Sequence, residues 1–89
     1  MNQDDIRIIK YHSLPIKNFN HWVFFQDLRP SRDAKGRKGR KNLIRYLESI
    51  LGPISQRWQY QHPSDHIYIL QLVEEKDLLF FLLKFKQVK

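Results

Sequence analysis

Eight basic side chains are concentrated in one stretch of the sequence, between Arg29 and Arg45. They are Arg29, Arg32, Lys35, Arg37, Lys38, Arg40, Lys41 and Arg45, and the stretch holds a single acid, Asp33. Its net charge of +7 (8 − 1) equals the formal net charge of the 89-residue chain, so the remainder is neutral. Charge confined in this way is typical of a segment that binds a polyanion, although a charged segment can also serve only to keep a protein in solution.

Two glycines within this segment affect how it is expected to fold. Glycine costs about 1 kcal/mol relative to alanine inside a helix, so Gly36 and Gly39 predict a basic, glycine-containing loop over 29–42. A helix is predicted over 43–51, with Asn42 as its N-cap and Gly52-Pro53 as its stop. Its apolar stripe consists of Leu43, Ile44, Leu47, Ile50 and Leu51.

The cations of the loop would then crowd the positive end of a helix dipole. A basic side chain at that end is destabilising by about 0.3–1 kcal/mol. A bound phosphate would reverse the penalty, because it would receive backbone N–H groups and side-chain charge together. The spacing of Gly36 and Gly39 is not that of a P-loop. The segment therefore predicts contacts to phosphates without a nucleotide-binding motif of that kind.

Aromatic residues could extend such a site by stacking on bases. Trp22, Trp58, Tyr60 and Tyr46 are the candidates, and Tyr46 is favoured because it lies off the apolar stripe of the helix. In a chain this small, aromatic residues at strand positions are more often part of the core. Arg57, on the polar face of its expected strand, could lengthen the basic patch. No aromatic pattern of an RNA-recognition motif and no zinc-finger spacing is present, so nothing supports base-specific reading.

A second group of residues could in principle do metal chemistry. Asp65 and the run Glu74-Glu75-Lys76 resemble the Pro-Asp…(Asp/Glu)-x-Lys nuclease family, in which two carboxylates hold a divalent cation and the lysine positions water. The resemblance covers residues 63–76 only, and Ser64 separates Pro63 from Asp65. His62 and His66 flank the same turn, but their spacing indicates a metal site only on a helix. We therefore expect no catalytic site, no metal and no cofactor.

The remaining elements are expected to be mostly strands. Alternation or continuous apolar runs predict strands over 5–11, 21–28, 54–61 and 67–73. Residues 74–86 fit either a strand or a short helix. The expected fold class is α+β: an antiparallel sheet of four to five strands with one main helix (43–51) packed on one face and possibly a second, short C-terminal helix.

Length and composition limit the other possibilities. The length predicts one domain over 1–89, and the absence of cysteine excludes disulfides, thiolate zinc sites and cysteine nucleophiles. The longest apolar run, Leu78 to Leu83, is six residues, against the roughly 20 that span a membrane. Because the chain starts with polar and acidic residues, it does not resemble a secretory signal, and we expect a cytoplasmic (intracellular) protein that does not bind membranes.

These observations predict a small, non-enzymatic nucleic-acid-binding module that contacts phosphates through its basic segment. The alternative is a small inhibitor or adaptor that covers an acidic surface of a partner protein. An enzyme that handles nucleic acid is one example of such a partner. The sequence leaves open DNA versus RNA, base specificity and the oligomeric state.

Overall fold

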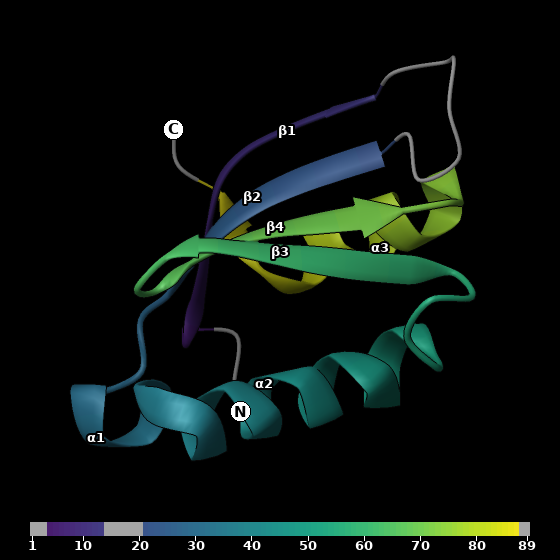
Figure 1. Ribbon diagram of the computed structural model, residues 1–89. Helices are drawn as coiled ribbons and strands as arrows, with labels where there is room; N and C mark the ends of the chain where they lie inside the picture. The colour runs from purple at the N-terminus through teal and green to yellow at the C-terminus, as the bar shows by residue number, and fades with distance from the viewer. Residues whose placement is uncertain (1–3, 14–20, 88–89) are drawn as a thin grey trace.

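The centre of the fold is an antiparallel sheet, seen in a computed structural model that describes residues 4–13 and 21–87. The order of strands across the sheet is β3-β4-β2-β1-β5 (Figure 1). The first four pair antiparallel, and the two-residue β5 pairs parallel with the start of β1. The strands are β1 (Ile6–Ser13), β2 (His21–Asp27), β3 (Trp58–Ser64), β4 (Ile67–Leu72) and β5 (Lys86–Gln87).

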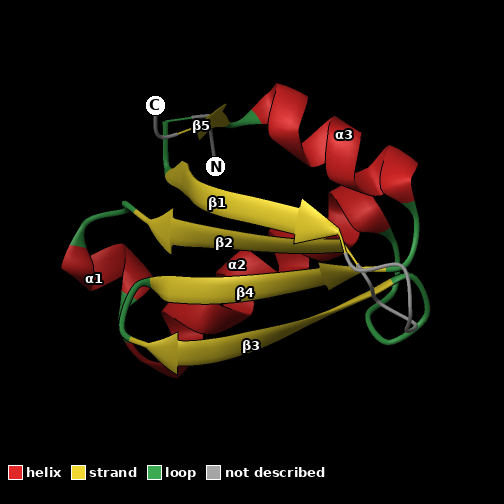
Figure 2. Ribbon diagram, turned by 90° about the horizontal axis from the view of Figure 1, so that it is seen from above, coloured by secondary structure: helices red, strands yellow, loops and turns green. Residues whose placement is uncertain are grey.

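Helices cover one face of this sheet. They are α1 (Ser31–Ala34), α2 (Gly36–Leu51) and α3 (Glu75–Lys84). The long helix α2 runs beneath the sheet, and α3 lies toward the β1 side (Figures 1 and 2). No helix of the described residues covers the opposite face. The α+β class and the antiparallel sheet with one main helix were predicted correctly, and of the two alternatives left open for residues 74–86 the structure has the short helix.

The core lies between the sheet and α2 and α3. Alternate strand residues point into it, while Leu43, Leu47 and Leu51 follow one side of α2. Each large apolar side chain buried in this way stabilises the fold by about 1.5–3 kcal/mol. The strands and α3 contribute Ile6, Ile8, Val23, Phe25, Trp58, Tyr68, Leu70, Leu72, Leu78, Phe81 and Phe85.

The prediction of a loop over 29–42 was wrong, because α2 begins at Gly36, not at residue 43. Gly39 is buried, and a Cβ there would lie 2.5 Å from the carbonyl carbon of Ala34 in α1. Glycine at this position therefore permits close packing of α1 on α2, which offsets its poor helix propensity. The N-cap position belongs to Lys35, which makes no side-chain capping bond, so Asn42 does not cap the helix. Gly36 has a φ of +80°, which turns the chain between the two helices.

The third strand differs from its expected bounds, and the segment left open between strand and helix is a helix. The third strand begins at Trp58 rather than residue 54, because residues 54–56 form a turn in which the Ser55 N–H donates to the Trp58 carbonyl at 2.7 Å. Residues 75–84 form a helix and not a strand. The acids Glu75 and Asp77 lie in the first turn of α3 and Lys84 in its last, as the helix dipole favours.

Candidate nucleic-acid interface

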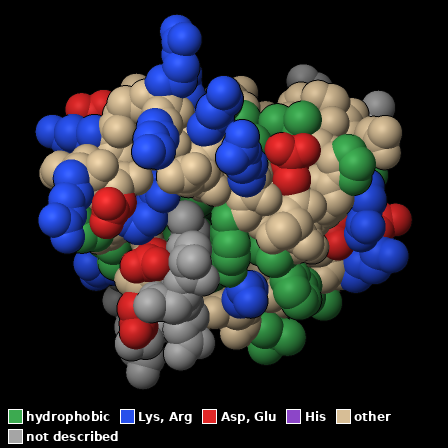
Figure 3. Space-filling view, turned by 90° about the horizontal axis from the view of Figure 1, so that it is seen from below, with side chains coloured by type: hydrophobic (Ala, Val, Ile, Leu, Met, Phe, Trp, Pro, Cys, Tyr) green, Lys and Arg blue, Asp and Glu red, His purple; other side chains and the backbone are tan. Residues whose placement is uncertain are grey.

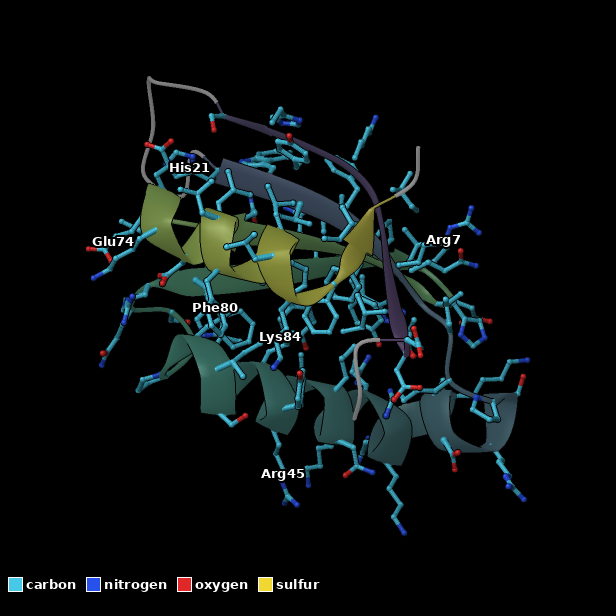
Figure 4. All side chains as sticks on the ribbon, turned by 180° about the vertical axis from the view of Figure 1, so that it is seen from behind. Arg7, His21, Arg45, Glu74, Phe80 and Lys84 are labelled. Atoms are coloured by element: carbon cyan, nitrogen blue, oxygen red, sulfur yellow. The ribbon has the colours of Figure 1, made fainter. Side chains whose placement is uncertain are left out.

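The outward face of α2 carries five exposed cations: Arg37, Lys38, Arg40, Lys41 and Arg45. These positions are exposed because the apolar side of α2 packs against the sheet. Seen from below, the molecule shows Lys and Arg side chains (blue) spread over this side (Figure 3). Arg45 projects from α2 away from the sheet (Figure 4). The first turn of α2 holds no acidic residue that would offset its dipole.

Most of the basic segment lacks a carboxylate partner. In the described part of the chain the ion pairs within 4.0 Å involve only Arg29, Arg57 and Lys76 among the cations. Seven of the eight basic residues of the segment therefore remain available to an external anion: Arg32, Lys35, Arg37, Lys38, Arg40, Lys41 and Arg45.

Arg29, the eighth, has a structural role. Its guanidinium lies 2.7 Å from the Asp27 carboxylate, and the two side chains are only 9% and 1% exposed. It also donates to the Gly39 carbonyl at 2.9 Å, which ties the end of β2 to the first turn of α2. The hydrogen bond to Asp27 raises the pKa of Arg29 further above its usual value. The structure places this side chain away from solvent, so it is not part of the exposed cationic face.

Arg57 does not lengthen the patch either. It precedes β3, and its guanidinium lies 2.7 Å from Asp77 and 3.3 Å from Glu74, at the start of α3. Its charge is thus balanced by the protein's own carboxylates.

The aromatic candidates are distributed over several surfaces. Tyr46 is half-buried against the core, with its ring edge-on to Phe85 at 6.2 Å. Trp58 is fully buried, and its indole N–H donates to the Gly52 carbonyl at 2.7 Å. Trp22 lies on the sheet face opposite α2, where its ring centroid is 5.3 Å from that of His12. Tyr60 of β3 lines a hollow together with Arg37 and Arg45, whereas Tyr46 lines a hollow on the other flank of α2 with Lys38.

Two adjoining hollows lie between α2 and the β3–β4 hairpin. The one near the start of α2 has a volume of about 240 Å³ and is lined by Lys35, Arg37, Arg40, His62, Asp65 and His66, among others. The second, of about 370 Å³, lies further along the helix. Arg37 and Arg40 line both, so we treat the two as one α2–β3 groove. Sequence reasoning gave His62 no part in this site, although strand alternation puts it on the same side as Tyr60.

A larger hollow of about 490 Å³ lies on the other flank of α2. Arg32 and Lys38 line it, but so do Asp5 and Asp33, and the Arg29 beside them is already paired with Asp27. Its two remaining cations are matched by two acids, so this hollow has little net attraction for a phosphate. The α2–β3 groove is the stronger candidate on charge.

The residues of the nuclease-like pattern are not brought together. Asp65 lies in the turn before β4, whereas Glu74 follows β4, so the two stand at opposite ends of a six-residue strand. Glu74 instead pairs with Lys76 and Arg57, each at 3.3 Å. Among the described residues, no group of three or more potential ligands of the His, Asp and Glu type could hold a metal ion.

Comparison with protein-family models, with curated proteins and with solved structures finds no match to this chain. In the described residues no helix has the length and apolar character needed to cross a membrane. Residues 1–3, part of the start on which the expectation about a secretory signal depends, lie outside the described residues.

Proposed function

We propose that this protein is a small, non-enzymatic nucleic-acid-binding module that holds phosphates on the exposed cations of α2. The observation that carries the proposal is the set of seven basic side chains, in one segment, without a carboxylate within 4.0 Å in the described structure. DNA and RNA both present the regular array of phosphates that such a face fits.

The arrangement is unfavourable for the helix itself, which supports a role in binding. Four pairs of cations stand three or four residues apart on α2: Arg37–Arg40, Lys38–Lys41, Arg37–Lys41 and Lys41–Arg45. Like charges at this spacing destabilise a helix by about 0.2–0.5 kcal/mol per pair, so the four together cost about 1–2 kcal/mol. Cations in the first turn add to this through the dipole. A bound polyanion would remove both penalties.

The test is fluorescence anisotropy with short labelled DNA and RNA at several salt concentrations. Five phosphate contacts on duplex DNA correspond to a slope of log K against log salt of about −4.5. Changing Arg37, Lys38, Arg40 and Lys41 to Ser should reduce the slope to about −1 and abolish binding at moderate salt. Equal affinity of this four-serine variant and the wild type would contradict the proposal.

A matched control removes the same amount of charge elsewhere. Arg7, Lys10, Lys76 and Lys84 lie outside the basic segment, on β1 and α3. Changing these four to Ser gives a protein of the same net charge as the α2 variant. We expect it to keep most of its affinity, because the overall charge is not what binds. If the two variants lost affinity equally, binding would be diffuse and not centred on α2.

The predicted alternative was an inhibitor or adaptor that binds an acidic surface of a partner protein, and an apolar surface on α3 favours a protein partner on a different ground. On α3, Leu79, Phe80 and Leu83 are 52%, 47% and 89% exposed. Exposed apolar side chains clustered on one helix face are typical of protein–protein contacts. This function predicts a stoichiometric complex with a partner protein that survives nuclease treatment. The complex should be lost in a Phe80→Ser, Leu83→Ser variant and retained when exposed residues on the sheet face opposite α2 are changed.

A further inference from the structure

The α2–β3 groove combines positive charge with aromatic rings. Five cations line it, Lys35, Arg37, Arg40, Lys41 and Arg45, against two acids, Asp65 and Glu48, which leaves a net charge of +3 (5 − 2). The wall opposite the helix is β3, from which Tyr60 and His62 reach the groove. A groove with cations on one side and rings on the other has the two features that bind an unpaired polynucleotide strand.

The groove is longer than a single phosphate needs. Lys35, the N-cap of α2, and Arg45 are ten residues apart (45 − 35), which corresponds to nearly three turns and about 15 Å along a helix. A lone phosphate would contact one end only, whereas a strand can follow the whole row. The length therefore favours a polymer over a mononucleotide or an inorganic anion.

His62 offers a surface for stacking a base. Its ring lies parallel to that of Tyr68, with the centroids 4.2 Å apart and an interplanar angle of 1°. Tyr68 is 1% exposed, whereas His62 is exposed, so the solvent meets the outer face and the edge of the imidazole. Tyr68 thus fixes the orientation of His62 and leaves one ring face open. Tyr60 is half-buried and presents less of its ring.

We propose that the α2–β3 groove binds single-stranded nucleic acid, with phosphates on Arg37 and Arg40 and a base stacked on the outer face of His62. This inference rests on the proposed function and makes it more specific. A duplex meets the cations of α2 equally well, but its bases are paired and stacked on one another and cannot cover a side-chain ring. The proposed site therefore distinguishes a single strand from a duplex.

The experiment measures anisotropy of a labelled 12-nucleotide oligothymidine and of a labelled 12-base-pair DNA duplex, with wild type and His62→Ala. Loss of one base–ring stack should weaken oligothymidine binding about 5- to 150-fold. Duplex binding should change by less than about twofold, since the cations remain. His62→Tyr should restore the single-strand affinity, because a planar ring is kept at the same place. Circular dichroism establishes that each variant is folded.

The control is His12→Ala on the opposite face of the sheet, where His12 lies within 5.8 Å of the Phe24 ring. It should bind both probes as wild type does. If His62→Ala binds oligothymidine as tightly as wild type, or loses both probes equally, the groove is not a base-stacking site. If His12→Ala loses the single strand instead, the open sheet face is the binding surface and the inference is overturned. Failure of the proposed function is separate: it would appear as full affinity of the four-serine α2 variant for both probes.

Discussion

Gly39→Ala tests whether the glycine in the basic helix serves helix packing or close approach of a ligand. An ordinary glycine in a helix interior is destabilising, so its replacement by alanine should stabilise the protein by about 1 kcal/mol. Gly39 is not ordinary. The added Cβ would stand 2.5 Å from both the carbonyl carbon and the carbonyl oxygen of Ala34, and 2.8 Å from the Asp33 carbonyl oxygen.

These neighbours are backbone atoms and cannot rotate away. To reach ordinary van der Waals contact at 3.4 Å, α1 would have to move by 0.9 Å (3.4 − 2.5) relative to α2. Overpacking of this kind typically costs about 1–3 kcal/mol. After the gain of about 1 kcal/mol in helix propensity, we expect Gly39→Ala to lower the free energy of unfolding by up to about 2 kcal/mol.

Urea denaturation followed by circular dichroism measures this change. Lys38→Gly is the matched control in the same turn, because it reports what a glycine costs at an exposed position. A Gly39→Ala variant that is more stable than wild type would refute the packing argument. The folded Gly39→Ala variant should still bind polyanions, because the cations of α2 point to solvent and away from the contact between α1 and α2. A large loss of affinity would instead indicate that a ligand approaches the helix closely at the glycine.

Two further predictions concern the buried polar groups near α2. Asp27→Ala should lower the free energy of unfolding by about 3–5 kcal/mol in urea denaturation, because it leaves the buried Arg29 guanidinium without its carboxylate. The double change Asp27→Leu, Arg29→Met should lower the free energy of unfolding by less, because no charge is then left buried. An equal loss in the two variants would contradict this explanation. Burial, and secondarily the charge of Asp27, raises the pKa of Tyr68 above the ordinary value of 10.0. As the pH rises, the Tyr68 hydroxyl therefore loses its proton in the unfolded chain before it does so in the folded protein. The free energy of unfolding should fall as the pH rises above about 10. Thermal unfolding between pH 9 and 11 should show this fall in wild type and a smaller one in Tyr68→Phe, and identical profiles would contradict it.

The sheet could be predicted from the sequence because its signals are local. Strand signals depend on neighbours two positions apart, so β4 was expected almost where it lies, whereas β3 was expected but lies three to four residues further along the chain. The stripe of leucines along α2 is equally local. The boundary error at its start has a tertiary cause: the cost of Gly39 is offset by Ala34 of α1, and helix propensity alone does not include that contact.

The ambiguity over residues 74–86 has a different origin. Leu78 to Leu83 is apolar throughout, and a continuous run fits a period of 2 and a period of 3.6 alike. In the structure Leu78 and Phe81 face the core while Leu79 and Leu83 are exposed, a helical pattern that the run itself conceals.

The exposed cations of α2 lie within the basic segment that stands out in the sequence, but the sequence did not separate cations without a carboxylate partner from those that have one. Arg29 and Arg57 look like the other cations, yet each lies against carboxylates of the protein's own chain. The partner of Arg57 is 20 residues away along the chain, which sequence spacing does not indicate. Which cations face solvent is therefore a property of the tertiary structure.

The pairing of β5 with β1 has a consequence for how the protein folds. Residues 7 and 86 are 79 positions apart (86 − 7), so this ladder can close only after most of the chain is in place. Until then the outer side of β1 presents free amide and carbonyl groups, an edge on which a second molecule could add. The bulge between Ile8 and Lys10 bends the strand just beyond the two positions that β5 covers. Refolding at high protein concentration should therefore favour aggregates joined through β1, and dilution should suppress them.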